Sequence, residues 1–130
     1  MTDKNNKPFS LRARLRSFGY AFKGIAVFMK TQHNAWIHLL AACAAVFLGF
    51  WLQISTVEWC VVILCIGLVF AAEAFNTAIE WLTDLVSPGK NEKAGKVKDL
   101  AAGAVLLISL ASAACGIIIF LPKLIDKLST

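Results

Sequence analysis

The sequence predicts an all-α integral membrane protein: a single domain, residues 1–130, with an N-terminal amphipathic surface helix followed by three transmembrane helices. Hydrophobic residues make up 58% of the chain and charged residues only 16%, whereas soluble domains carry roughly 25% charged residues. Formal charges are absent from residues 31–57, 59–72 and 100–122. The first and third of these stretches exceed the ~20 residues that cross the hydrocarbon core of a bilayer. The composition therefore argues against an ordinary soluble domain.

The surface helix is expected over about residues 10–30. Ser10 can cap its N-terminus, and apolar residues then recur at steps of four and three from Leu11 to Met29. Four basic side chains fall off this apolar face: Arg12, Arg16, Lys23 and Lys30. A basic amphipathic helix of this kind lies in the membrane interface.

The three transmembrane helices are expected at about 33–54, 57–87 and 97–121. The charge-free part of the second is short by itself, so this helix spans the bilayer only if it continues past Glu73 to about Val86. Pro88-Gly89 then gives a strong turn signal, and we expect the third helix to end at Pro122.

The distribution of lysine and arginine predicts the orientation in the membrane. These residues concentrate in 1–30 and in the second connection, 90–98, whereas the first connection, "QISTVE", holds none. The positive-inside bias therefore places the N-terminus and the second connection in the cytoplasm. The net charge of +5 is interpreted as topology and attraction to anionic lipids. No nucleic-acid partner is expected.

A polar stripe interrupts the second transmembrane helix, in the stretch "EAFNTAIEWLTD". At ~100° per residue, one side of the helix carries Glu73, Asn76, Thr77, Glu80 and Asp84. Such a face cannot look at lipid, and ionisable residues inside a membrane span are functional candidates by default.

A structural role as an ion-pair partner is the alternative for these carboxylates. Asp84 lies within reach of Lys96 or Lys98 near the membrane surface, whereas no basic residue within the spans is expected to meet Glu73. Glu73 is therefore the stronger candidate for chemistry.

The stripe suits phosphoryl transfer. A carboxylate kept away from bulk water can take a proton from a hydroxyl. A second carboxylate nearer the cytoplasm can hold Mg²⁺, which brings nucleotide phosphates with it, and lysines of the second connection can bind those phosphates. The sequence thus predicts transfer of phosphate from a cytoplasmic nucleotide to a membrane-embedded alcohol.

Two alternatives belong to other classes. A small transporter or channel subunit could use the acidic residues as a proton or cation relay. A relay should continue towards the outside, but the second span has no such polar groups from Trp59 to Ala72. The second alternative is an assembly subunit without catalysis.

The stripe, with Lys98-Asp99 and "AAGAVLL" downstream, resembles the small integral-membrane lipid kinases of the prokaryotic diacylglycerol kinase/undecaprenol kinase family. The resemblance extends from about Ser17, in "SFGYAFKGI", to the third span. It implies a homotrimer in the bacterial inner membrane, with composite active sites at the cytoplasmic interface, ATP as phosphate donor and Mg²⁺ as cofactor.

The resemblance also assigns roles to residues. Glu73 falls at the catalytic base that deprotonates the lipid hydroxyl. The metal ligands implied are Glu80 and Gln32. The nucleotide contacts implied are Tyr20, Lys98 and Asp99, and we add Lys90 and Asn91 of the second connection as nucleotide-binding candidates. The supporting residues implied are Asn34, Asn76 and Asp84.

Two positions depart from the family pattern. Gln32 stands where the family commonly has a second metal-binding glutamate, so one negative charge is missing and Mg²⁺ should bind more weakly. The loop "GKN", residues 89–91, replaces the "EYH" of many members, which affects how the nucleotide is held. The acceptor is left between diacylglycerol, which would give phosphatidic acid, and undecaprenol, with a narrow preference for diacylglycerol.

Overall fold

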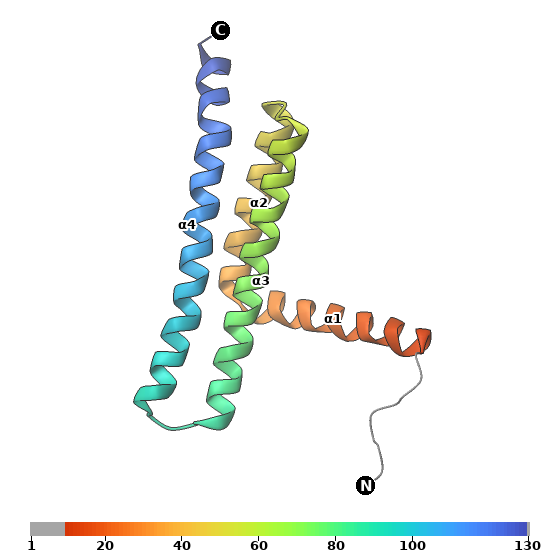
Figure 1. Cartoon of the computed structure of the whole chain (residues 1–130), viewed down its shortest axis with the longest axis vertical. Coiled ribbons are helices and arrows are strands. Elements are labelled where there is room, and N and C mark those ends of the chain that lie inside the picture. The colour runs from red at the N-terminus through yellow and green to blue at the C-terminus, as the bar shows by residue number, and fades with distance from the viewer. Residues whose placement is uncertain (1–9, 130) are drawn as a thin grey trace.

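The computed structural model describes residues 10–129 and folds them into four α-helices, with no strand in that range (Figure 1). The helices are α1 Leu11–Thr31, α2 His33–Trp51, α3 Thr56–Val86 and α4 Glu92–Leu128. Helices α2, α3 and α4 are each long and apolar enough to cross a membrane. The prediction of an all-α integral membrane protein is therefore confirmed.

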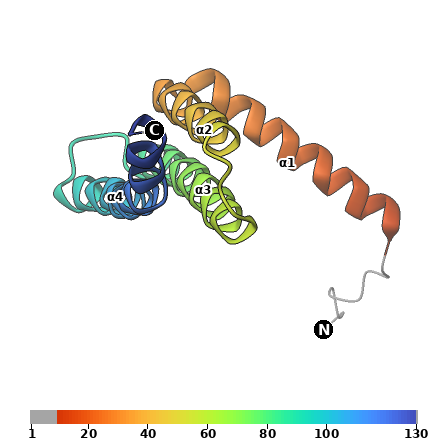
Figure 2. The same cartoon turned by 90° about the horizontal axis from the view of Figure 1, so that it is seen from above.

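The three long helices run side by side, and α1 runs across their direction and extends away from them (Figures 1 and 2). Helix α3 packs along α4 and, less extensively, against α2. The α3–α4 connection and the junction of α1 with α2 lie toward one end of this bundle, which we call the basic end. The α2–α3 connection and the C-terminus lie at the opposite end (Figure 1).

Helix α1 exposes the apolar face expected from its sequence. Ser10 caps the helix by accepting a hydrogen bond from the backbone N–H of Ala13 at 3.4 Å. The exposed apolar side chains of α1 include Leu11, Leu15 and Phe18. Among the residues of α1, only Phe28 is buried. A helix whose apolar face is left uncovered by the bundle matches one that lies on a membrane surface.

Close packing joins α2 to α3 at the opposite end of the bundle. Gly49 lies directly against the indole ring of Trp59, where a Cβ atom would come within 2.7 Å of a ring carbon. The short connection turns at Gln53, whose φ of 52° is in the left-handed region. Ser55 and Glu58 then form a capping box that starts α3.

Helix α4 is longer than the sequence predicted at both ends. It begins at Glu92 instead of 97, because the side chain of Asn91 accepts hydrogen bonds from two backbone N–H groups and caps the helix. The prediction that it ends at Pro122 is wrong, since the helix continues to Leu128. Proline inside a helix costs about 3 kcal/mol. Packing of Leu124 on the core and the ion pair of Lys123 with Glu58 hold the last turns in place.

Candidate active site

A buried carboxylate and a histidine form the deepest part of the polar stripe. Glu73 on α3 is 4% exposed, and its Oε1 atom lies 2.9 Å from Nε2 of His38 on α2. When the carboxylate is ionised it can only accept hydrogen bonds, and His38 then donates from Nε2. The expectation that Glu73 meets no basic residue in the spans is therefore wrong.

The sequence offered only a weak signal for this pair. His38 lies near the start of the first span, where a histidine is equally compatible with an interfacial position. Its partner is 35 residues away in the chain, so only the packing of α2 on α3 brings the two side chains together. His38 is the functional candidate that the sequence did not identify.

The rest of the stripe opens progressively toward the basic end. Thr77 is buried at 5% exposed, Asn76 and Glu80 are half-buried, and Asp84 is exposed. The side-chain amide of Asn76 donates to Glu80 Oε1 at 3.2 Å. The Asn76 Oδ1 atom is buried and accepts no hydrogen bond within residues 10–129. Four polar side chains therefore line a path from the interior of the bundle to its basic end.

A polar cavity of about 430 Å³ lies where this path reaches the α3–α4 connection. Its lining includes four of the residues selected from the sequence: Asp84, Lys90, Asn91 and Lys98. Lys98 Nζ forms an ion pair with Asp84 Oδ1 at 2.5 Å, whereas Lys96 pairs with Glu92 within its own helix. The alternative of an ion pair for Asp84 is confirmed, with Lys98 as the partner.

Four other selected residues belong neither to the polar stripe nor to the lining of this cavity. Gln32 is half-buried at the junction of α1 and α2, and no hydrogen bond joins it to Glu80 in the described part of the chain. Tyr20 is 62% exposed on α1. Asn34 and Asp99 are exposed near the starts of α2 and α4. One chain by itself therefore does not gather the whole selected set.

The donor atoms of the stripe fit a hard cation. Across residues 10–129, no three histidine, cysteine, aspartate or glutamate side chains are grouped closely enough to hold a metal ion alone. Mg²⁺, however, is usually held by one or two carboxylates together with substrate phosphates and water. The Glu80 carboxylate and the unpartnered Asn76 oxygen next to it are oxygen donors of this type.

A buried carboxylate at the inner end of a polar path that opens on a lysine-lined cavity suits a membrane enzyme that acts at the bilayer surface. Comparison with known proteins narrows the class. The profile of the family described as prokaryotic diacylglycerol kinase matches residues 19–120. The chain belongs to this family and is a lipid kinase.

Individual relatives carry two different names. The chain is 38% identical to an undecaprenol kinase of Bacillus subtilis, over 94% of this chain and 99% of the relative. It is 37% identical to a diacylglycerol kinase of Synechocystis, over 86% of this chain and 65% of the relative. A diacylglycerol kinase of Escherichia coli is 28% identical over 72% of this chain and 76% of its own length.

Proposed function

We propose that this lipid kinase transfers the γ-phosphate of ATP to the hydroxyl of a membrane lipid at the basic end of the bundle, with Glu73 as general base. The observation that carries the proposal is the buried Glu73 carboxylate, hydrogen-bonded to His38 at the inner end of the polar stripe. A carboxylate that is shielded from water and fixed in orientation is suited to take a proton from an alcohol.

The reaction moves one proton and one phosphoryl group. The lipid hydroxyl gives its proton to Glu73 as the hydroxyl oxygen bonds to the γ-phosphorus of ATP. The bond from that phosphorus to the bridging oxygen breaks, and ADP leaves with the bridging oxygen. His38 occupies Oε1 of the carboxylate, so Oε2 remains for the lipid hydroxyl.

The nucleotide occupies the lysine-lined cavity and the outer part of the stripe. Asp84 and Glu73 are separated by about 16 Å along the axis of α3, at ~1.5 Å per residue, and Glu80 lies between them. A triphosphate that runs from the cavity along this path brings its γ-phosphate towards Glu73. Lys90 and Lys98 supply positive charge where the path begins.

The remaining selected residues complete the nucleotide and metal contacts. Glu80 holds Mg²⁺, with Asn76 and Gln32 offering neutral oxygens. When bound, Mg²⁺ neutralises charge on the phosphates. Further nucleotide contacts come from Tyr20, Asn91 and Asp99. Asn34 and Asp84 are supporting residues of the active site.

The active site is composite, and the protein is a homotrimer in the bacterial inner membrane. Support comes from Gln32, Tyr20 and Asp99, none of which belongs to the stripe or to the lysine-lined cavity of its own chain, because residues of neighbouring subunits would complete each site. The basic end faces the cytoplasm, where ATP is available, since the lysines and arginines concentrate there.

Undecaprenol is the acceptor that we favour, and diacylglycerol is the second candidate. The similarity to an undecaprenol kinase covers 94% of this chain and 99% of that relative. The diacylglycerol kinases of Synechocystis and E. coli are covered over 65% and 76% of their lengths. End-to-end similarity favours undecaprenol over the narrow preference for diacylglycerol that the sequence suggested.

The test is transfer of labelled γ-phosphate from ATP to undecaprenol and to diacylglycerol in parallel, with purified protein in micelles and with or without Mg²⁺. We expect Mg²⁺-dependent label in undecaprenol at a higher kcat/KM than in diacylglycerol. Preferential labelling of diacylglycerol would reverse the choice of acceptor. Label in neither lipid would contradict the proposed function.

A further inference from the structure

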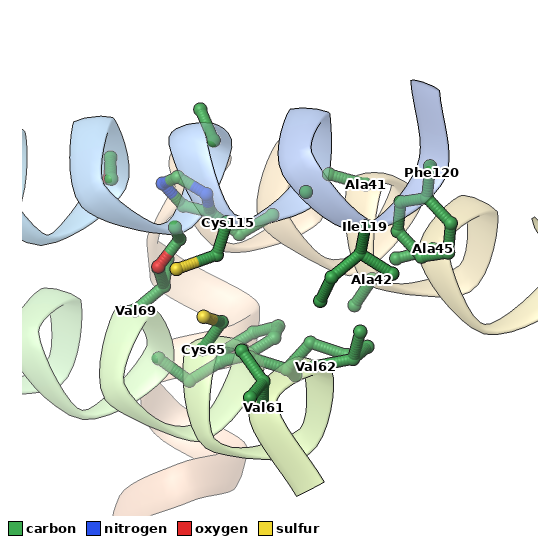
Figure 3. A pocket seen from close by; sticks show the side chains of 17 residues that line it. Ala41, Ala42, Ala45, Val61, Val62, Cys65, Val69, Cys115, Ile119 and Phe120 are labelled. Carbon is green, nitrogen blue, oxygen red and sulfur yellow. The ribbon is translucent and has the colours of Figure 1, made fainter. Parts of the chain in front are cut away.

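An apolar cavity of about 310 Å³ lies among α2, α3 and α4 (Figure 3). The reaction proposed above assigns no role to this cavity. Small side chains from α2, among them Ala41, Ala42 and Ala45, form one wall, and valines and a cysteine of α3 form another. Binding sites for small molecules are concave, mostly apolar and begin at roughly 300 Å³. This cavity therefore has room for a segment of one hydrocarbon chain, but not for a whole lipid.

The cavity is elongated parallel to the helices. On α3 its lining runs from Val61 to Phe70, which is about 14 Å at ~1.5 Å per residue. The antiparallel helix α4 faces this stretch, and the sulfur atoms of Cys65 and Cys115 point toward one another across the gap (Figure 3). The long direction of the cavity thus follows the direction in which the helices cross the membrane.

The polarity of the lining changes along this direction. Its polar residues are His38 and Ser109, which lie in the half of their helices nearer the basic end, and Ser112, which lies just past the middle of α4. The other end is closed by the buried side chains Val62 and Ile119 of the hydrophobic core. A lipid of the leaflet at the basic end has the same arrangement, with a polar group near the surface and a tail that points into the bilayer.

His38 connects the cavity to the candidate active site. It lines the cavity and also hydrogen-bonds Glu73 at 2.9 Å. An alcohol whose hydroxyl reaches Glu73 therefore lies at the polar end of the cavity, and its hydrocarbon tail needs an apolar continuation from there.

We propose that the cavity among α2, α3 and α4 binds the first part of the hydrocarbon tail of the acceptor lipid, with the hydroxyl at Oε2 of Glu73, beside His38. The proposal rests on the proposed function, because the tail is positioned by an alcohol that reacts at Glu73. Small residues on α2 keep the slot open, and their size sets which tails fit.

Four cysteines provide a binding assay that does not depend on turnover. Cys65 and Cys115 line the cavity, whereas Cys43 and Cys60 are exposed and lie outside its lining. The full-length protein in phosphatidylcholine nanodiscs is alkylated with N-ethylmaleimide, with and without undecaprenol or diacylglycerol, and each site is quantified by mass spectrometry. We expect an accepted lipid to slow alkylation of Cys65 and Cys115 only. Alkylation rates that do not change at any of the four sites when lipid is added would overturn the proposal. So would protection of Cys65 and Cys115 by a neighbouring subunit in the absence of added lipid.

A filled cavity gives the matching kinetic test. Ala42→Phe places a ring in the slot, and Ala44→Phe, at an exposed position outside the lining, is the matched control. We expect Ala42→Phe to raise KM for the long-chain acceptor by about tenfold relative to the control. With dibutyrylglycerol or prenol, whose chains are too short to fill the slot, the two variants should agree within about twofold.

The two proposals fail in different ways. Equal KM values of Ala42→Phe and Ala44→Phe for the long-chain lipid, with phosphate transfer intact, would remove the tail site and leave the kinase reaction standing. Loss of transfer to short and long acceptors alike in Ala42→Phe alone, with its trimer intact, would show that position 42 acts on the reaction centre and would also contradict a tail site. Absence of transfer by the unaltered protein would contradict the proposed function itself.

Discussion

The hydrogen bond between His38 and Glu73 makes the most specific kinetic prediction. We expect His38→Ala to lower kcat while leaving KM for ATP nearly unchanged, because the bond orients the base and lies away from the lysine-lined cavity. A hydrogen bond to a charged group contributes ~1.5–3 kcal/mol, and each 1.36 kcal/mol corresponds to a factor of ~10 in rate. The His38 side chain is 23% exposed, so water can replace part of the bond. The expected loss is therefore in the lower half of that range, about 10- to 40-fold.

The assay is steady-state transfer of labelled phosphate to the preferred lipid at saturating acceptor. His38→Gln, whose amide can still donate to the carboxylate, should recover part of the lost rate. His33→Ala, an exposed histidine of the same helix, is the matched control. In a double-mutant cycle, His38→Ala should cost far less in the Glu73→Gln background than in the unaltered protein. Equal costs in both backgrounds, or no loss in the single variant, would refute the assignment of His38 as a positioning residue.

Three further predictions concern the metal, the nucleotide and the packing. Gln32→Glu restores a carboxylate ligand and should lower the Mg²⁺ concentration for half-maximal rate by about tenfold; an unchanged Mg²⁺ dependence would place residue 32 outside the metal shell. Lys98→Ala should raise KM for ATP by about 5- to 10-fold, while Lys127→Ala near the C-terminus should not; a change in Tm without a change in KM would reduce Lys98 to its ion pair. Gly49→Ala forces the neighbouring indole ring to move and should destabilise the protein by about 1–3 kcal/mol in thermal unfolding. Gly67→Ala, with open space around it in this chain, should instead be neutral or stabilising.

Most of the architecture could be predicted because the membrane restricts the choice. Every backbone group must be satisfied inside the bilayer, which allows only helices and closed barrels, and an apolar run of ~20 residues has the length of a helix and not of a barrel strand. The cap of Ser10 was readable from the sequence, whereas the equally local cap of Asn91 was missed. The end of α4 was not readable, because the contacts that carry the helix past Pro122 come from α3, through Glu58 and the core around Leu124.

The same difference between local contacts and contacts from another helix applies to the candidate site. The polar stripe follows from helical periodicity alone, and four of its residues do form a path along α3 in the order expected. The partner of Asp84 could be predicted because Lys98 is close in sequence across a tight connection. The partner of Glu73 could not, since it depends on the rotation of α2 against α3.

The role of Glu73 is the central claim, and one measurement tests it directly. Glu73→Gln removes the base but keeps the size of the side chain, and Glu58→Gln at the opposite end is the matched control, because glutamine can still complete the capping box there. Both variants are purified, shown to assemble as the unaltered protein does, and assayed for transfer of labelled γ-phosphate to the preferred lipid. We expect Glu73→Gln to lose about 10²- to 10⁴-fold in kcat, with Glu58→Gln close to the unaltered rate. Comparable turnover by a properly assembled Glu73→Gln variant would contradict the account.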